Sequence, residues 1–102
     1  MNKYRVFIHG RNLIGHDNTD QVSKFGFYVT VFVQAKNATD AERKALLLIE
    51  QDSELQAIAL NQAGDDLILE VEEIEEIDSF EDAAFPRTGF SLYLDDAEIN
   101  VQ

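Results

Sequence analysis

The stretch FGFYVTVFVQA, residues 25–35, constrains the fold more than any other part of the chain. One alternating set of its side chains is wholly apolar and comprises Phe25, Phe27, Val29, Val31 and Val33. The other set is mixed in polarity and comprises Gly26, Tyr28, Thr30, Phe32 and Gln34. A repeat of two residues is typical of a β-strand, and a strand that is apolar on one face and half apolar on the other is expected inside a sheet. We therefore predict a central strand over residues 25–35.

The first residues of the chain show the same period. In KYRVFIH, residues 3–9, one face carries Tyr4, Val6 and Ile8 and the other carries Lys3, Arg5, Phe7 and His9. This pattern predicts a strand that pairs in antiparallel fashion with residues 25–35. The intervening residues 11–24 are rich in Asn, Asp and Gly, which predicts a loop, with a short strand extension at Leu13–Ile14 as an alternative.

A helix is expected next, over residues 37–55. Thr39 and Glu42 have the spacing of a capping box, in which both side chains bond to free backbone N–H groups of the first turn. The apolar face of this helix comprises Ala38, Ala41, Ala45, Leu48 and Ile49. Residues 55–66 fit three structures: a prolonged helix, a second short helix, or irregular chain as far as Gly64.

The second half of the chain predicts two more strands. Leu67, Leu69 and Val71 alternate, but the apolar spacing then changes to three at Ile74 and Ile77. That change predicts a β-bulge near Glu72–Glu73. Residues 80–88 are expected to form a loop, residues 89–94 a last strand with Phe90, Leu92 and Leu94 on one face, and the remaining residues a frayed end or a short edge.

The predicted order is β-β-α-β-β in a single α+β domain covering residues 1–102. It consists of a small antiparallel or mixed sheet with one main helix packed on one face. A chain of this length can bury a core without disulfides, and the absence of Cys excludes thiolate nucleophiles and cysteine-based metal sites. Neither a signal peptide nor a membrane span is predicted, so we expect a cytoplasmic protein.

Three segments carry a resemblance to other proteins. They are YRVFIHGRN, GFYVTVFVQAKNATDAERKALLLI and VEEIEEIDSF, and together they cover about two thirds of the chain. Their pattern resembles that of a group of small uncharacterised bacterial proteins. The strand–strand–helix part is also faintly similar to HicB-type antitoxin domains. The resemblance implies the same order of elements and no known activity.

Charge is the most unusual property of the sequence. Residues 1–64 hold seven acidic and seven basic side chains, so the net charge of −12 arises entirely in residues 65–102. The stretch DDLILEVEEIEEIDSFED, residues 65–82, contains ten carboxylates and neither Lys nor Arg. Such a field repels nucleic acid and favours a basic partner, although a solvated strand face is the simpler interpretation. The density of charge exceeds what edge protection needs, because neighbouring carboxylates repel one another.

These observations predict a non-catalytic module that binds a basic protein through its acidic C-terminal half, as an inhibitor, immunity protein or antitoxin-like protein would. The predicted partner-binding residues are Glu70, Glu72, Glu73, Glu75, Glu76 and Asp78. Phe80, Phe85 or Tyr93 is expected to supply an apolar anchor. No direct contact with nucleic acid or with a membrane is expected.

The alternative hypothesis uses the other face of the first strand pair. Aromatic and basic side chains gather there and would line a small-ligand site or a homodimer interface, or pack against the C-terminal strand or loop. Such a face could also stack nucleic-acid bases, but the net charge of −12 disfavours that use. The residues concerned are Arg5, Phe7, His9, Tyr28 and Phe32.

Neither a catalytic nor a metal site is predicted. His9 and His16 are the only histidines, and no serine lies in the context of a nucleophile elbow. His16, Asp17, Asn18 and Asp20 offer possible cation ligands, and Asp-Asp pairs recur at residues 65–66 and 95–96. Their spacing does not match an EF-hand, and zinc would require more nitrogen ligands. We therefore expect no enzyme activity and no cofactor.

Overall fold

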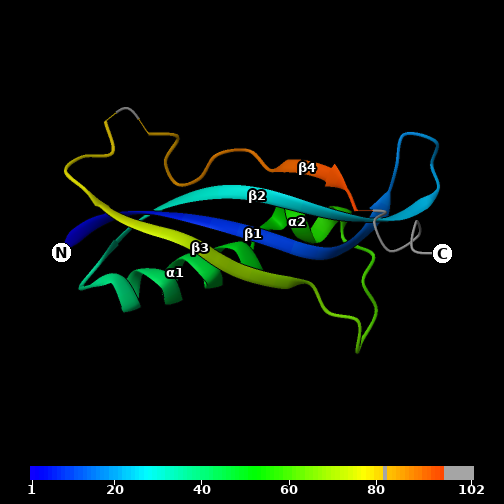
Figure 1. Ribbon diagram of the computed structural model, residues 1–102, viewed down its shortest axis with the longest axis horizontal. Coiled ribbons are helices and arrows are strands. Elements are labelled where there is room, and N and C mark those ends of the chain that lie inside the picture. Colours follow the sequence, from blue (N-terminus) through cyan, green and yellow to red (C-terminus); the bar gives the residue numbers. More distant parts are fainter. Residues whose placement is uncertain (82, 96–102) are drawn as a thin grey trace.

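The computed structural model describes residues 1–81 and 83–95, and it confirms a small α+β domain (Figure 1). The observed order is β-β-α-α-β-β, which matches the predicted order except for a second short helix. The elements are β1 (Asn2–His16), β2 (Val22–Ala35), α1 (Ala38–Glu50), α2 (Ser53–Ile58), β3 (Ile68–Ile77) and β4 (Ser91–Leu94). They form a four-stranded sheet in the order β3-β1-β2-β4, and every neighbouring pair is antiparallel. The chain therefore passes from β2 through the two helices to the far side of β1, so that β2 and β3 run in the same direction without pairing with each other.

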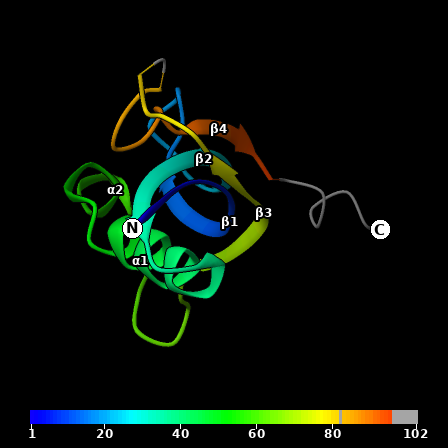
Figure 2. The ribbon, with the colours of Figure 1, turned by 90° about the vertical axis from the view of Figure 1, so that its left-hand side faces the viewer.

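The core lies between α1 and one face of the sheet. Figures 1 and 2 show α1 running along this face, where it packs against β1, β2 and β3. The register pairs Val6 with Val31 and Ile8 with Val29, and all four side chains are buried. The helix contributes three fully buried side chains to this core, those of Ala41, Ala45 and Ile49. The two alanines are small, so they let the helix approach the sheet closely. The predicted apolar face of residues 25–35 is confirmed.

The first two strands are longer than predicted. Pairing continues from Leu13 with Phe25 to His16 with Val22, so most of the predicted loop over residues 11–24 is strand, and the connection is confined to residues 17–21. The ladder passes an irregularity between Gly10 and Leu13, where Asn12 has a φ of 62°. Asn tolerates this left-handed conformation better than most residues, so a composition typical of loops here marks a bulge inside a strand.

The helix begins with a different cap from the one predicted. Asn37 is the N-cap, and its side chain accepts a hydrogen bond from the Asp40 N–H at 2.9 Å. Asp40 in turn accepts from the Lys36 N–H at 3.1 Å, so the reciprocal pattern exists two residues before the predicted Thr39–Glu42 pair. The helix also ends earlier than predicted, at Glu50.

A second short helix resolves the ambiguity over residues 55–66. Asp52 caps α2 by accepting a hydrogen bond from the Leu55 N–H at 2.9 Å, and Leu55 is buried in the core. After α2 the chain is irregular as far as the turn around Gly64, which has a φ of 88°.

The segment after β3 covers one edge of the sheet. The Phe32 N–H donates to the Pro86 carbonyl at 2.8 Å, and the Thr88 N–H donates to the Thr30 carbonyl at 2.9 Å, after which β4 pairs with β2. Arg87 ties the same segment to the start of α2, because its guanidinium forms ion pairs with Asp52 at 2.6 Å and with Glu54 at 2.8 Å. The edge of β2 is thus occupied, as Figure 1 shows.

The last predicted strand is shorter than expected, since β4 spans four residues rather than residues 89–94. The predicted frayed end lies, apart from Asp95, outside the described residues. Within the described part of the chain, neither helix is long and apolar enough to span a membrane.

Candidate binding surface

The acidic edge is the surface formed by Glu70, Glu72, Glu73, Glu75, Glu76 and Asp78. The first five lie on β3, an edge strand of the sheet, and Asp78 follows directly after it. A bulge places them: Phe7 pairs with Glu73 and Ile8 with Val71, so Glu72 is an extra residue in the ladder. The predicted bulge at Glu72–Glu73 is therefore confirmed, and it breaks the alternation of side chains along the strand.

Two of these carboxylates are partly neutralised by β1. Arg11 forms an ion pair with Glu70 at 3.0 Å, and Arg5 forms one with Glu75. Both pairs are about half exposed, so solvent screens them. Glu72, Glu73, Glu76 and Asp78 are exposed and have no ion-pair partner among residues 1–81 and 83–95. The edge thus keeps most of its negative charge.

An aromatic ladder lies on the sheet face opposite α1, beside the acidic edge. It consists of Phe7, Tyr28, His9 and Tyr93, which come from β1, β2 and β4. The ring centroids of Phe7 and Tyr28 are 5.4 Å apart and those of His9 and Tyr28 are 4.5 Å apart, both nearly parallel. Tyr93 completes the ladder at 5.9 Å from both His9 and Tyr28. All four rings are at least partly exposed, so this face can receive a ligand or a partner side chain.

A hydrogen bond fixes the end of the ladder. The Tyr93 hydroxyl lies 2.6 Å from His9 Nε2. Burial raises the pKa of Tyr93, and Tyr28 and Asp95 act in the same direction. The phenol is therefore protonated at neutral pH and can donate to the imidazole.

Phe32 belongs to the same face but not to the accessible part of it. Only 7% of Phe32 is exposed, because the ring of Phe80 packs edge-on against it, with 6.2 Å between the ring centroids. Phe85 packs in turn against Phe80, with 4.9 Å between the ring centroids. The structure therefore brings Arg5, Phe7, His9 and Tyr28 together at an accessible surface and covers Phe32 with the chain's own loop. Of the three proposed anchors, Tyr93 joins the ladder, Phe80 covers Phe32, and Phe85 remains 59% exposed.

One group of metal-ligating side chains was not predicted from the sequence. Ligand atoms of His9, Glu70 and Glu72 all lie within 4.8 Å of one another. His9 lies on β1, whereas Glu70 and Glu72 precede and follow Val71 on β3. Only the pairing of these two strands and the bulge at Glu72 bring the three side chains together. Two of the three are already engaged, Glu70 by Arg11 and His9 by Tyr93.

The loop that offered cation ligands in the sequence is organised by its own hydrogen bonds. Asp17 accepts from the backbone and hydroxyl of Thr19 at 2.8 and 2.7 Å, from the Gln21 N–H at 3.0 Å and from the Ser23 hydroxyl at 3.0 Å. These bonds, the one from the Thr19 hydroxyl foremost, lower the pKa of Asp17 to about 2. Both of its oxygens serve the turn that joins β1 to β2.

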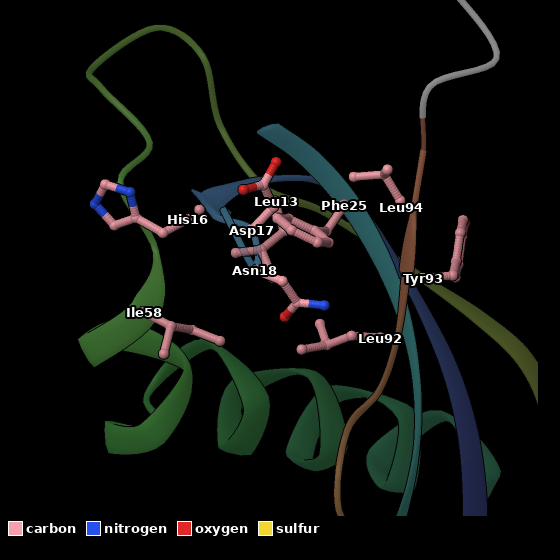
Figure 3. Close-up of a pocket in the computed structure, with 10 residues that line it drawn as sticks. Leu13, His16, Asp17, Asn18, Phe25, Ile58, Leu92, Tyr93 and Leu94 are labelled. Carbon is pink, nitrogen blue, oxygen red and sulfur yellow. The ribbon is translucent and has the colours of Figure 1, made fainter. Parts of the chain in front are cut away.

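A pocket of about 440 Å³ lies beside this turn, away from the acidic edge. Figure 3 shows Ile58 of α2 and Leu92 of β4 on opposite sides of it. Leu13 and Phe25 contribute further apolar surface, and Asp17 lines it with a carboxylate already held by four hydrogen bonds. The pocket therefore offers mainly apolar contacts.

Comparison with known protein families, with curated proteins and with solved structures finds no match. The resemblance to small bacterial proteins therefore stays a prediction.

Proposed function

We propose that this protein is a non-catalytic interaction module that binds a basic protein partner through the acidic edge. The observation that carries the proposal is the position of the charge. Four carboxylates, Glu72, Glu73, Glu76 and Asp78, are exposed along one border of the sheet without an ion-pair partner among the described residues. Their mutual repulsion costs stability, and a cationic partner would relieve it.

The aromatic ladder supports the same function. A Lys or Arg side chain that reaches across the edge would meet the ring of Phe7, which pairs with Glu73 across the strands, and a cation close to an aromatic ring is attracted to it. The carboxylates would raise the association rate and select the partner, and the rings would add short-range contacts. An inhibitor, immunity or antitoxin-like role is compatible with such a surface.

Capture on the immobilised protein from the lysate of its source cell, washed at low and then high salt, would identify the partner. The test is then the association rate of the purified partner with two matched variants. Glu72→Gln/Glu73→Gln/Glu76→Gln/Asp78→Asn removes four charges from the acidic edge. Glu42→Gln/Glu50→Gln/Asp66→Asn/Glu81→Gln removes four exposed charges elsewhere.

The edge variant should associate about tenfold or more slowly at low salt, and the difference should shrink at high salt. The second variant should retain most of the original rate. Equal rates for the two variants would contradict the proposal.

The alternative function is a homodimeric module that binds a small ligand on the sheet face around Phe7 and Tyr28. Tyr28 is 37% exposed, which favours some contact there, whereas Phe32 is covered and would not take part. Analytical ultracentrifugation separates the two hypotheses. A stable dimer that dissociates on Tyr28→Ala substitution would favour the alternative.

A further inference from the structure

The two edges of the sheet differ in whether another part of the described chain covers them. The edge of β2 that faces away from β1 is covered by residues 86–94, which hydrogen-bond to it from Phe32 to Phe25. Along β3, the only strand partner among the described residues is β1. The outer backbone N–H and C=O groups of this ten-residue strand therefore face away from the sheet. An uncovered edge of this length is a template for another strand.

The side chains of β3 indicate which strand would fit. Glu70, Glu73 and Glu75 stand opposite His9, Phe7 and Arg5, on the face that carries the aromatic ladder. On the opposite face, Leu69, Val71 and Ile74 pack against the core but remain partly exposed. A strand added to β3 would therefore place basic side chains beside the glutamates and apolar side chains beside Val71 and Ile74.

The same charges act against pairing of β3 with itself. Two copies joined at this edge would bring their glutamates side by side, and like charges on neighbouring strands are destabilising. A basic segment reverses the sign of that interaction. The edge therefore discriminates against a second copy of the chain and in favour of a cationic strand.

Building on the proposed function, we propose that the partner docks by β-augmentation: an extended segment with alternating basic and apolar residues adds to the outer edge of β3 as a fifth strand. Backbone hydrogen bonds would supply affinity, and the carboxylates of the acidic edge would supply selectivity. The segment would lie alongside the aromatic ladder, which adjoins β3 through Phe7 and His9.

Three fluorescent peptides test this with the wild-type protein. The first alternates Lys and Val over ten residues. The second has the same sequence with every backbone amide N-methylated, which keeps the side chains and charges but removes the N–H donors. The third has five Lys followed by five Val, so that its composition is unchanged and its alternation is lost. Fluorescence anisotropy at low salt gives the three affinities, and amide hydrogen exchange reports on residues 68–77.

We expect the alternating peptide to bind at least about tenfold more tightly than the other two. N-methylation removes the backbone donors of the second peptide, and the block order of the third cannot place basic residues on one face of the added strand and apolar residues on the other. Only this peptide should slow amide exchange along β3. Equal affinities within about twofold, without protection of β3, would overturn strand addition while leaving a charge-driven contact with a basic partner intact. Failure of all three peptides to bind at low salt would contradict the proposed function as well.

Discussion

The Tyr93 hydroxyl lies 2.6 Å from Nε2 of His9, although these residues belong to β4 and β1, which do not pair with each other. Tyr93 reaches across β2 to do so, passing over Gly26, its partner in the register. The hydrogen bond therefore joins β1 to β4 across β2, on the face opposite α1, and fixes the orientation of the imidazole beside the acidic edge.

Removing this hydrogen bond should destabilise the fold modestly. We expect Tyr93→Phe to lower the free energy of unfolding by about 1 kcal/mol, because the ring contacts remain and a partly buried imidazole nitrogen loses its partner. Urea denaturation measures this. Tyr28→Phe is the matched control, since its ring stacks in the same ladder without a hydroxyl hydrogen bond among the described residues. Equal losses in the two variants would contradict a specific role for the bond.

Gly26 is required by the position of Tyr93. A Cβ atom on Gly26 would overlap the end of the Tyr93 ring, so Gly26→Ala should force the ring out of the ladder. We expect a loss of about 1 to 3 kcal/mol in the free energy of unfolding. Gly89→Ala should change it by less than about 0.5 kcal/mol, since a Cβ there meets open space. In a Tyr93→Ala background most of the cost of Gly26→Ala should disappear, and a cost that persists would point to the backbone instead.

The acidic edge should limit the stability of the isolated protein. Glu72→Gln/Glu73→Gln/Glu76→Gln is expected to raise the free energy of unfolding by about 0.5 to 1 kcal/mol at low salt, because it relieves repulsion between exposed neighbours on one strand. The gain should vanish in 1 M salt, where these charges are screened. Thermal melts at two ionic strengths test this prediction, and a loss of stability at low salt would show that the carboxylates support the fold.

Asp17 should make the stability of the fold sensitive to acid. Its pKa is lowered from 3.8 to about 2 in the folded protein, so its contribution is fully present above about pH 4 and is lost as the pH falls through 2. We expect Asp17→Asn to remove part of this acid dependence. Asp20→Asn is the control, because the Asp20 side chain lies in the same turn and is 94% exposed. Urea midpoints measured from pH 5 to pH 2 distinguish the two, and parallel profiles for wild type and Asp17→Asn would contradict the prediction.

Much of the fold could be predicted because it depends on local periodicity. The alternation in residues 25–35 predicted the buried face, and the change of spacing after Val71 predicted the bulge at Glu72. The predictions that were wrong concern positions where a tertiary contact decides between local alternatives. Asn12 allows β1 to continue because its side chain bonds to Asp65 and its carbonyl accepts from Asn61, residues about fifty positions away.

The candidate surface shows the same division. The acidic residues could be predicted from their density alone, but not that β3 would be an edge strand, since strand order depends on which strand pairs with β1. Tyr93 was predicted as an anchor, yet its contact with His9 depends on the register between β4 and β2. Phe80 covers Phe32 because of the path that its loop takes over the sheet, and the composition of the loop does not predict that path.

The sequence by itself determined the α+β class, the faces of the strands and the concentration of negative charge, because alternation, helical spacing and charge are properties of neighbouring residues. Only the tertiary structure decided that one edge of the sheet is covered and the acidic one left open. It also decided that rings from three strands form one ladder, because both depend on hydrogen bonds and packing between residues far apart in the chain.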